Sequence, residues 1–98
     1  MKIAGNIAFS EEVVETMREM ADRGCDVRSL TSYVQSSLNL DPTSHVVLLA
    51  YFCRAFSLPL LDVLPIRDWV GSDQDEEINR EILPKIEHAK SKWLQPSH

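Results

Sequence analysis

The amino-acid sequence predicts an all-α fold, a compact single-domain bundle of about five helices. Apolar residues recur at three- and four-residue steps along most of the chain, which is the spacing of a buried helix face. No segment keeps up the alternation of apolar and polar residues that a half-buried strand shows. The 98 residues suffice for one ordinary core, so residues 1–98 are expected to form one domain.

The first two helices have clear start signals. Residues 11–23 follow Ser10 and precede Gly24, and residues 27–38 follow Asp26. Ser and Asp side chains accept hydrogen bonds from the free amides of a first helical turn, and Gly readily adopts the left-handed conformation that ends a helix. Burial of the apolar stripe of the first helix leaves a line of glutamates on its outer side. We name this line the N-terminal acidic row: Glu11, Glu15 and Glu19.

The third helix is expected over residues 42–56, at the centre of the bundle. Asp41-Pro42 is a strong start signal, because Asp caps free amides and Pro has the φ angle of the first helical position. Arg54 is the only Asp, Glu, Lys or Arg in this segment, so apolar groups cover almost its whole circumference. The charge of Arg54 must therefore reach solvent along its stem or pair with an acid. The acids expected for such a pair are Asp62 and Asp68.

Two prolines set the expected limits of the remaining helices. A short fourth helix is expected over residues 58–64, opened by Ser57 and closed by Pro65. A last helix is expected over residues 75–94, with Pro84 inside it. Proline removes one backbone hydrogen bond and clashes with the preceding turn, at a cost of about 3 kcal/mol in a regular helix. We therefore expect the last helix to be kinked or broken at Pro84.

Carboxylates crowd around the start of the last helix. General acid catalysis by such a group needs a pKa raised by burial or by like-charged neighbours, and these side chains are expected to be solvated. An enzyme that uses them is the least favoured hypothesis, and we predict that the protein is not an enzyme. A solvated helix N-terminus and an acidic contact surface both remain open. We name these residues the C-terminal acidic cluster: Asp73, Asp75, Glu76, Glu77 and Glu81.

The sequence shows no pattern that is typical of a metal site or of a phosphate-binding loop. The three histidines lie far from one another and from both cysteines, without metal-ligand spacing, and the three glycines form no phosphate loop. We expect no metal and no other cofactor. The longest uncharged stretch, residues 42–53, is shorter than the roughly 20 apolar residues that span a bilayer, and the N-terminus has no secretory signal. The sequence therefore predicts a cytoplasmic protein that has no membrane partner.

The charge is negative and unevenly distributed. The net charge of −5 opposes direct binding to a nucleic acid, whose phosphates require a concentrated basic stripe. Residues 10–26 hold six acids against two arginines, and residues 73–81 hold five acids against one arginine. Two acidic faces suit a basic partner, because complementary fields speed encounter and raise specificity.

Several stretches between residues 46 and 94 are similar to a pattern in small bacterial proteins. There, an aromatic-rich helix leads into an AF-x-L-x-L turn, a P-I-x-x-W element, an acidic spacer and a final helix. The matching stretches are Tyr51 to Leu60 (YFCRAFSLPL), Leu64 to Ile66, Asp68-Trp69, Asp75 to Ile78 and Ile82 to Trp93. Such proteins resemble the immunity proteins that are encoded beside toxins of contact-dependent and other polymorphic systems. Many of these toxins are nucleases, but the motif is apolar and identifies no particular toxin.

The leading hypothesis from the sequence is an immunity protein that binds and neutralises a cognate bacterial toxin domain, an RNase rather than a membrane-active toxin. The N-terminal acidic row and the C-terminal acidic cluster are its candidate partner-binding residues. A protein that covers a nuclease's basic patch with carboxylates occupies the place of the phosphates and needs no catalysis. The alternative hypothesis is a helical adaptor or regulatory protein that recognises a protein partner through its own groove.

Overall fold

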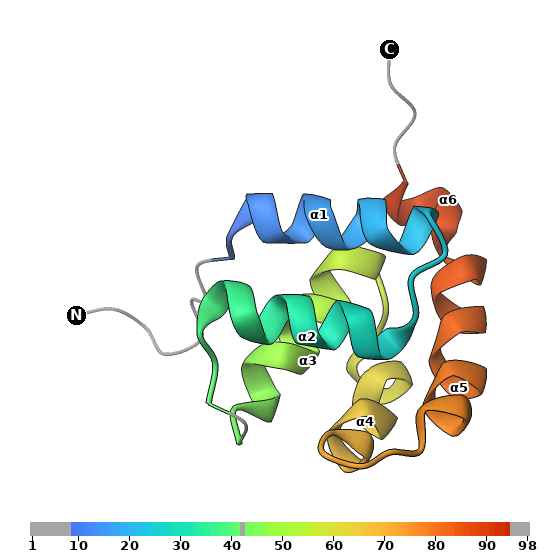
Figure 1. Ribbon diagram of the computed structural model, residues 1–98. Coiled ribbons are helices and arrows are strands. Elements are labelled where there is room, and N and C mark those ends of the chain that lie inside the picture. Colours follow the sequence, from blue (N-terminus) through green and yellow to red (C-terminus); the bar gives the residue numbers. More distant parts are fainter. Residues whose placement is uncertain (1–8, 42, 95–98) are drawn as a thin grey trace.

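The computed structural model describes residues 9–41 and 43–94, and within these residues it consists of helices and loops without strands (Figure 1). The all-α fold class predicted from the sequence is therefore confirmed. The helices are α1 (Glu11–Asp22), α2 (Val27–Leu38), α3 (His45–Phe56), α4 (Leu60–Trp69), α5 (Asp75–His88) and the short α6 (Lys90–Trp93).

The first two helices begin and end almost where the sequence predicts. The Ser10 hydroxyl accepts a hydrogen bond from the Val13 amide at 3.4 Å, and the Asp26 carboxylate accepts one from the Ser29 amide at 2.9 Å. Both are N-caps of the kind that satisfy a free amide in the first turn. Gly24 follows α1 with a φ angle of 94°, a value that glycine adopts without strain.

The third helix is central, as predicted, because α3 packs against α1, α2, α4 and α6. Its Phe52 and Phe56 are fully buried, and the Phe56 ring meets the Trp93 ring edge to face, with 5.1 Å between ring centres. The helix is not enclosed on every side, since Val46 in its first turn is exposed. Burial of this apolar helix supplies much of the core.

The start of α3 lies three residues after the predicted one, at His45. The carboxylate of Asp41 accepts hydrogen bonds from the Thr43 amide at 3.0 Å and from the Thr43 hydroxyl at 2.9 Å. Asp41 therefore caps a turn that precedes the helix, which is the usual competing role of such a side chain. The predicted first helical residue, Pro42, lies outside the described residues.

The limits predicted for the fourth helix were wrong. Ser57 is the left-handed C-terminal residue of α3, with a φ angle of 53°, and α4 begins at Leu60. α4 also continues through Pro65 to Trp69, although proline costs one hydrogen bond. The physical reason is burial on both sides of the proline, where the side chains of Val63, Ile66 and Trp69 all enter the core. Their transfer from water offsets the lost hydrogen bond.

The last helix is divided in two, but not at Pro84. α5 runs through Pro84 to His88, and Ala89 separates it from α6. Ile82 and Ile86 lie in the core on either side of the proline and hold the helix together in the same way as in α4. Trp93 of α6 closes the end of the core, and its indole N–H donates to the Ile86 carbonyl at 2.9 Å.

Candidate functional site

The two acidic regions predicted from the sequence lie on different parts of the molecule. α1 and α5 each pack against α2, and the start of α5, in orange, lies at the opposite end of the view from α1, in blue (Figure 1). The fold therefore does not join the N-terminal acidic row and the C-terminal acidic cluster into one site. Each has to be considered as a separate surface.

The glutamates of the N-terminal acidic row are paired with arginines. The pairs are Glu11 with Arg54 at 2.7 Å, Glu15 with Arg18 at 3.6 Å and Glu19 with Arg23 at 3.9 Å. The row therefore presents much less unbalanced charge than its sequence indicates.

Arg54 forms a structural pair, but with a different acid from those expected. Its guanidinium donates to the Glu11 carboxylate and lies 5.4 Å from the centre of the Phe9 ring. Asp62 and Asp68 belong to α4, whereas Glu11 begins α1, and α3 packs against both of these helices. Both members of the pair are at least half exposed. The bond therefore joins the first turn of α1 to α3 at the surface of the protein.

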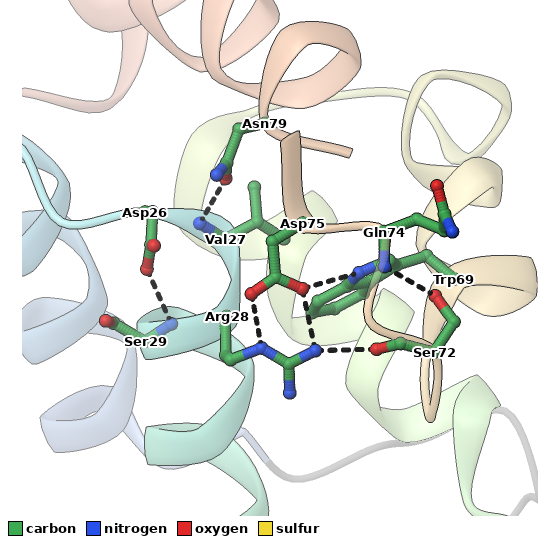
Figure 2. Close-up of polar contacts among 9 residues, drawn as sticks. All are labelled: Asp26, Val27, Arg28, Ser29, Trp69, Ser72, Gln74, Asp75 and Asn79. Carbon is green, nitrogen blue, oxygen red and sulfur yellow. Dashed lines mark hydrogen bonds and ion pairs between the residues drawn. The ribbon is translucent and has the colours of Figure 1, made fainter. Parts of the chain in front are cut away.

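In the C-terminal acidic cluster, Asp75 is already bonded on both oxygens (Figure 2). Arg28 of α2 donates to it through Nε at 2.6 Å and through Nη2 at 2.7 Å. The indole N–H of Trp69 donates to the same carboxylate at 3.2 Å, and the Arg28 guanidinium lies 5.1 Å from the centre of the Trp69 ring. Arg28 also donates to the Ser72 carbonyl at 2.6 Å. Asp75 thus ties together α2, the end of α4 and the start of α5.

The ionisation of the Asp75 carboxylate follows from its contacts. The hydrogen bonds from Arg28 hold the pKa of Asp75 below its usual value, and the bond from Trp69 adds to this effect. The same carboxylate raises the pKa of Arg28. A further bond between the helices runs from the Val27 amide to the Asn79 side-chain carbonyl at 2.9 Å. These contacts give Asp75 a structural role.

Three other members of the cluster are exposed and free of such contacts. The side chains of Asp73, Glu76 and Glu77 form no hydrogen bond or ion pair with the described residues, although the charge of Asp73, after those of Asp75 and Asp26, adds to the raised pKa of Arg28. Glu81 is bonded to Lys85 at 2.9 Å, one helical turn later. The unbalanced negative charge of this region therefore belongs to Asp73, Glu76 and Glu77, and we name them the unpaired carboxylates.

Beside the unpaired carboxylates, α4, α5 and the loop between them line an open surface hollow of about 460 Å³. The buried side chains of Trp69 and Ile78 line it, together with Pro65. Its exposed edge carries carboxylates, contributed by Asp68, Glu77 and Glu81. We name this space the α4–α5 hollow. It combines an apolar interior with an acidic edge.

Residues that hold this region in place were missed by the sequence reasoning. Trp69 stands six residues before Asp75, so an acid-rich helix start just after a tryptophan was a usable local signal. Arg28 stands 47 residues before Asp75, and no pattern along the chain connects them.

The remaining kinds of site are metal-binding groups and membrane-spanning helices. No group of three or more His, Cys, Asp or Glu side chains in residues 9–41 and 43–94 is placed to hold a metal ion. Within the same ranges, every helix is too short or too polar to cross a bilayer.

Comparisons of the chain with protein-family models, with curated proteins and with solved structures gave no match.

Proposed function

We propose that this protein is an immunity protein that binds and neutralises a cognate bacterial toxin domain, and that this domain is a nuclease with a basic surface. The observation that carries the proposal is the group of three exposed, unpaired carboxylates, Asp73, Glu76 and Glu77, at the start of α5. Unbalanced charge on one face costs stability through self-repulsion, and a basic partner would relieve it.

The mechanism is electrostatic and requires no chemical step. A nuclease binds its substrate through cations that contact phosphates. Carboxylates placed on the same cations occupy the phosphate positions and prevent the substrate from binding. Complementary charge also steers the two proteins together, so inhibition follows quickly after encounter.

The direct test uses the protein encoded beside this chain in the native genome, because immunity proteins are encoded next to their toxins. Its C-terminal domain is purified, and cleavage of a labelled RNA is followed with and without an equimolar amount of this protein. We expect cleavage by that domain to stop, while an unrelated basic RNase stays active. Unchanged cleavage at a large excess of this protein would contradict the proposal.

A second candidate function is a helical adaptor that binds a protein partner through an apolar surface. It is favoured by two neighbouring leucines at the start of α4, Leu60 and Leu61, of which Leu61 is 77% exposed. Large apolar side chains gathered on a surface are typical of contact sites. A pull-down from the native host separates the two functions, because a toxin domain supports immunity and a housekeeping complex supports the adaptor.

A further inference from the structure

We propose that the α4–α5 hollow receives one arginine side chain of a protein partner, an inference that rests on the proposed function for the partner being a basic protein. The hollow would make this arginine the central anchor of the interface. Anchors of this kind are single aromatic or arginine side chains that fill a pocket in the partner.

The interior of the hollow fits the stem of such a side chain. Trp69 is only 6% exposed, and Ile78 beside it is also buried, so the wall is apolar and is held by the core. The volume of about 460 Å³ is in the lower part of the range of about 300–1,000 Å³ for ligand pockets. A side chain with three methylene groups covers apolar surface while its charged end stays near the edge.

The edge of the hollow fits the charged end. Asp68, Glu77 and Glu81 contribute three carboxylates, and no Lys, Arg or His among the described residues lines the hollow. Glu81 is bonded to Lys85, but the Glu77 side chain has no bond to another described residue, and Asp68 has only a 3.6 Å contact with the exposed Arg67. The local field is therefore negative at the place where a cation would arrive.

The Trp69 wall of the hollow is held in place before a partner binds. Asp75 accepts from the Trp69 indole N–H, and the guanidinium of Arg28 lies over the same ring (Figure 2). A wall that is already ordered lowers the entropy lost on binding. Arginine fits the acidic edge better than lysine, because its planar guanidinium donates to several carboxylates at once.

The test is an NMR titration with the peptide acetyl-Gly-Gly-Arg-Gly-Gly-amide. The chain has two tryptophans, so two indole N–H signals report on it. Trp93 is an internal control, because its indole N–H is bonded to the Ile86 carbonyl and it does not line the hollow. We expect the Trp69 signal to shift and to saturate, and the Trp93 signal to stay in place. The matching citrulline peptide, which has the same shape without the charge, should leave both signals unchanged.

Paired variants separate the hollow from the net charge. The double substitution Asp68→Asn and Glu77→Gln changes two exposed carboxylates of the edge, and should weaken peptide binding by about fivefold or more. Glu12→Gln with Glu87→Gln makes the same change in net charge at exposed residues outside the hollow, and should leave binding within about twofold of the parent. Both double variants should keep the parent's pattern of core signals.

Several results would overturn the inference. These are a Trp69 signal that does not move, equal binding of the citrulline peptide, equal binding of a peptide that has lysine in place of the arginine, or equal weakening by both double variants. A Trp69 shift that depends on protein concentration alone would assign the hollow to a second copy of the chain, and would also contradict the inference. Peptide binding without inhibition of a nuclease rejects only the proposed function. Inhibition of a nuclease without peptide binding rejects only the role of the hollow.

Discussion

Two places in the molecule combine a carboxylate, an arginine and an aromatic ring: Asp75, Arg28 and Trp69 at the start of α5, and Glu11, Arg54 and Phe9 beside α1. We name them the α5 trio and the α1 trio. In the α5 trio the arginine uses two nitrogens on the carboxylate, and the aromatic ring donates a further hydrogen bond. In the α1 trio a single bond joins the arginine to the carboxylate. The α5 trio is thus the more constrained of the two.

The difference between the two trios shows that acidic residues with similar surroundings in the sequence can have different structural roles. The side chains of Arg54 and Glu11 are 50% and 61% exposed, whereas those of Arg28 and Asp75 are 45% and 35% exposed. The α1 trio balances the charge of its own region. The α5 trio uses one carboxylate to fix Trp69 and leaves its neighbours unbalanced beside the hollow.

The largest expected effect comes from removing the aromatic ring of each trio. Trp69→Ala should lower the free energy of unfolding by about 3–5 kcal/mol, because it removes a buried ring and leaves a cavity. Phe9→Ala should cost about 1–2 kcal/mol, because Phe9 is only partly buried. Denaturation by urea measures both. An equal cost for the two variants would show that the α1 trio is anchored as firmly as the α5 trio.

The next effect is a pH dependence specific to the α5 trio. The folded protein holds the pKa of Asp75 below its unfolded value of 3.8, so the carboxylate stabilises the fold fully above that value. This contribution is lost as the pH falls through the lower folded pKa. In an NMR titration the Trp69 indole signal should therefore move with a midpoint below 3.8, and the Trp93 signal should not follow it. Asp75→Asn should remove this acid transition, and a midpoint at or above 3.8 would contradict the assigned bonds.

The smallest effect is expected in the α1 trio. Arg54→Met removes an exposed ion pair and should change the free energy of unfolding by about 1 kcal/mol or less. Partner binding should be unchanged, as measured by titration calorimetry with the proposed toxin domain. Loss of binding at unchanged stability would mean that Arg54 contacts the partner, and would reverse the roles given to the two trios.

The fold was predictable where its determinants are local. The limits of α1 and α2 followed from Ser10 and Asp26, whose side chains bond to amides three residues away. The limits of α4 were not predictable, because Pro65 costs the same local free energy in a buried helix as in an exposed one. Only the tertiary burial of Ile66 and Trp69 beyond it decides that the helix continues.

The candidate site was predictable in composition but not in roles. Charge along the chain identified Asp73, Glu76 and Glu77 as an acidic region, and the structure leaves these side chains exposed. The same pattern could not distinguish Asp75 from them, because its partner Arg28 is 47 residues away in the sequence. A contact made by folding cannot be read from neighbouring residues.

The most direct test compares two triple charge reversals for their rate of association with the proposed toxin domain, the C-terminal domain of the protein encoded beside this chain. One variant carries lysine at Asp73, Glu76 and Glu77, and the other carries lysine at Glu11, Glu15 and Glu19. At an ionic strength of about 0.15 M, where fields fade over about 8 Å, charges outside the contact contribute little. We predict that the first variant associates about tenfold or more slowly than the parent protein, and that the second associates nearly as fast as the parent. Equal slowing by both variants, or slowing by the second alone, would contradict the claim that the unpaired carboxylates at the start of α5 form the binding surface.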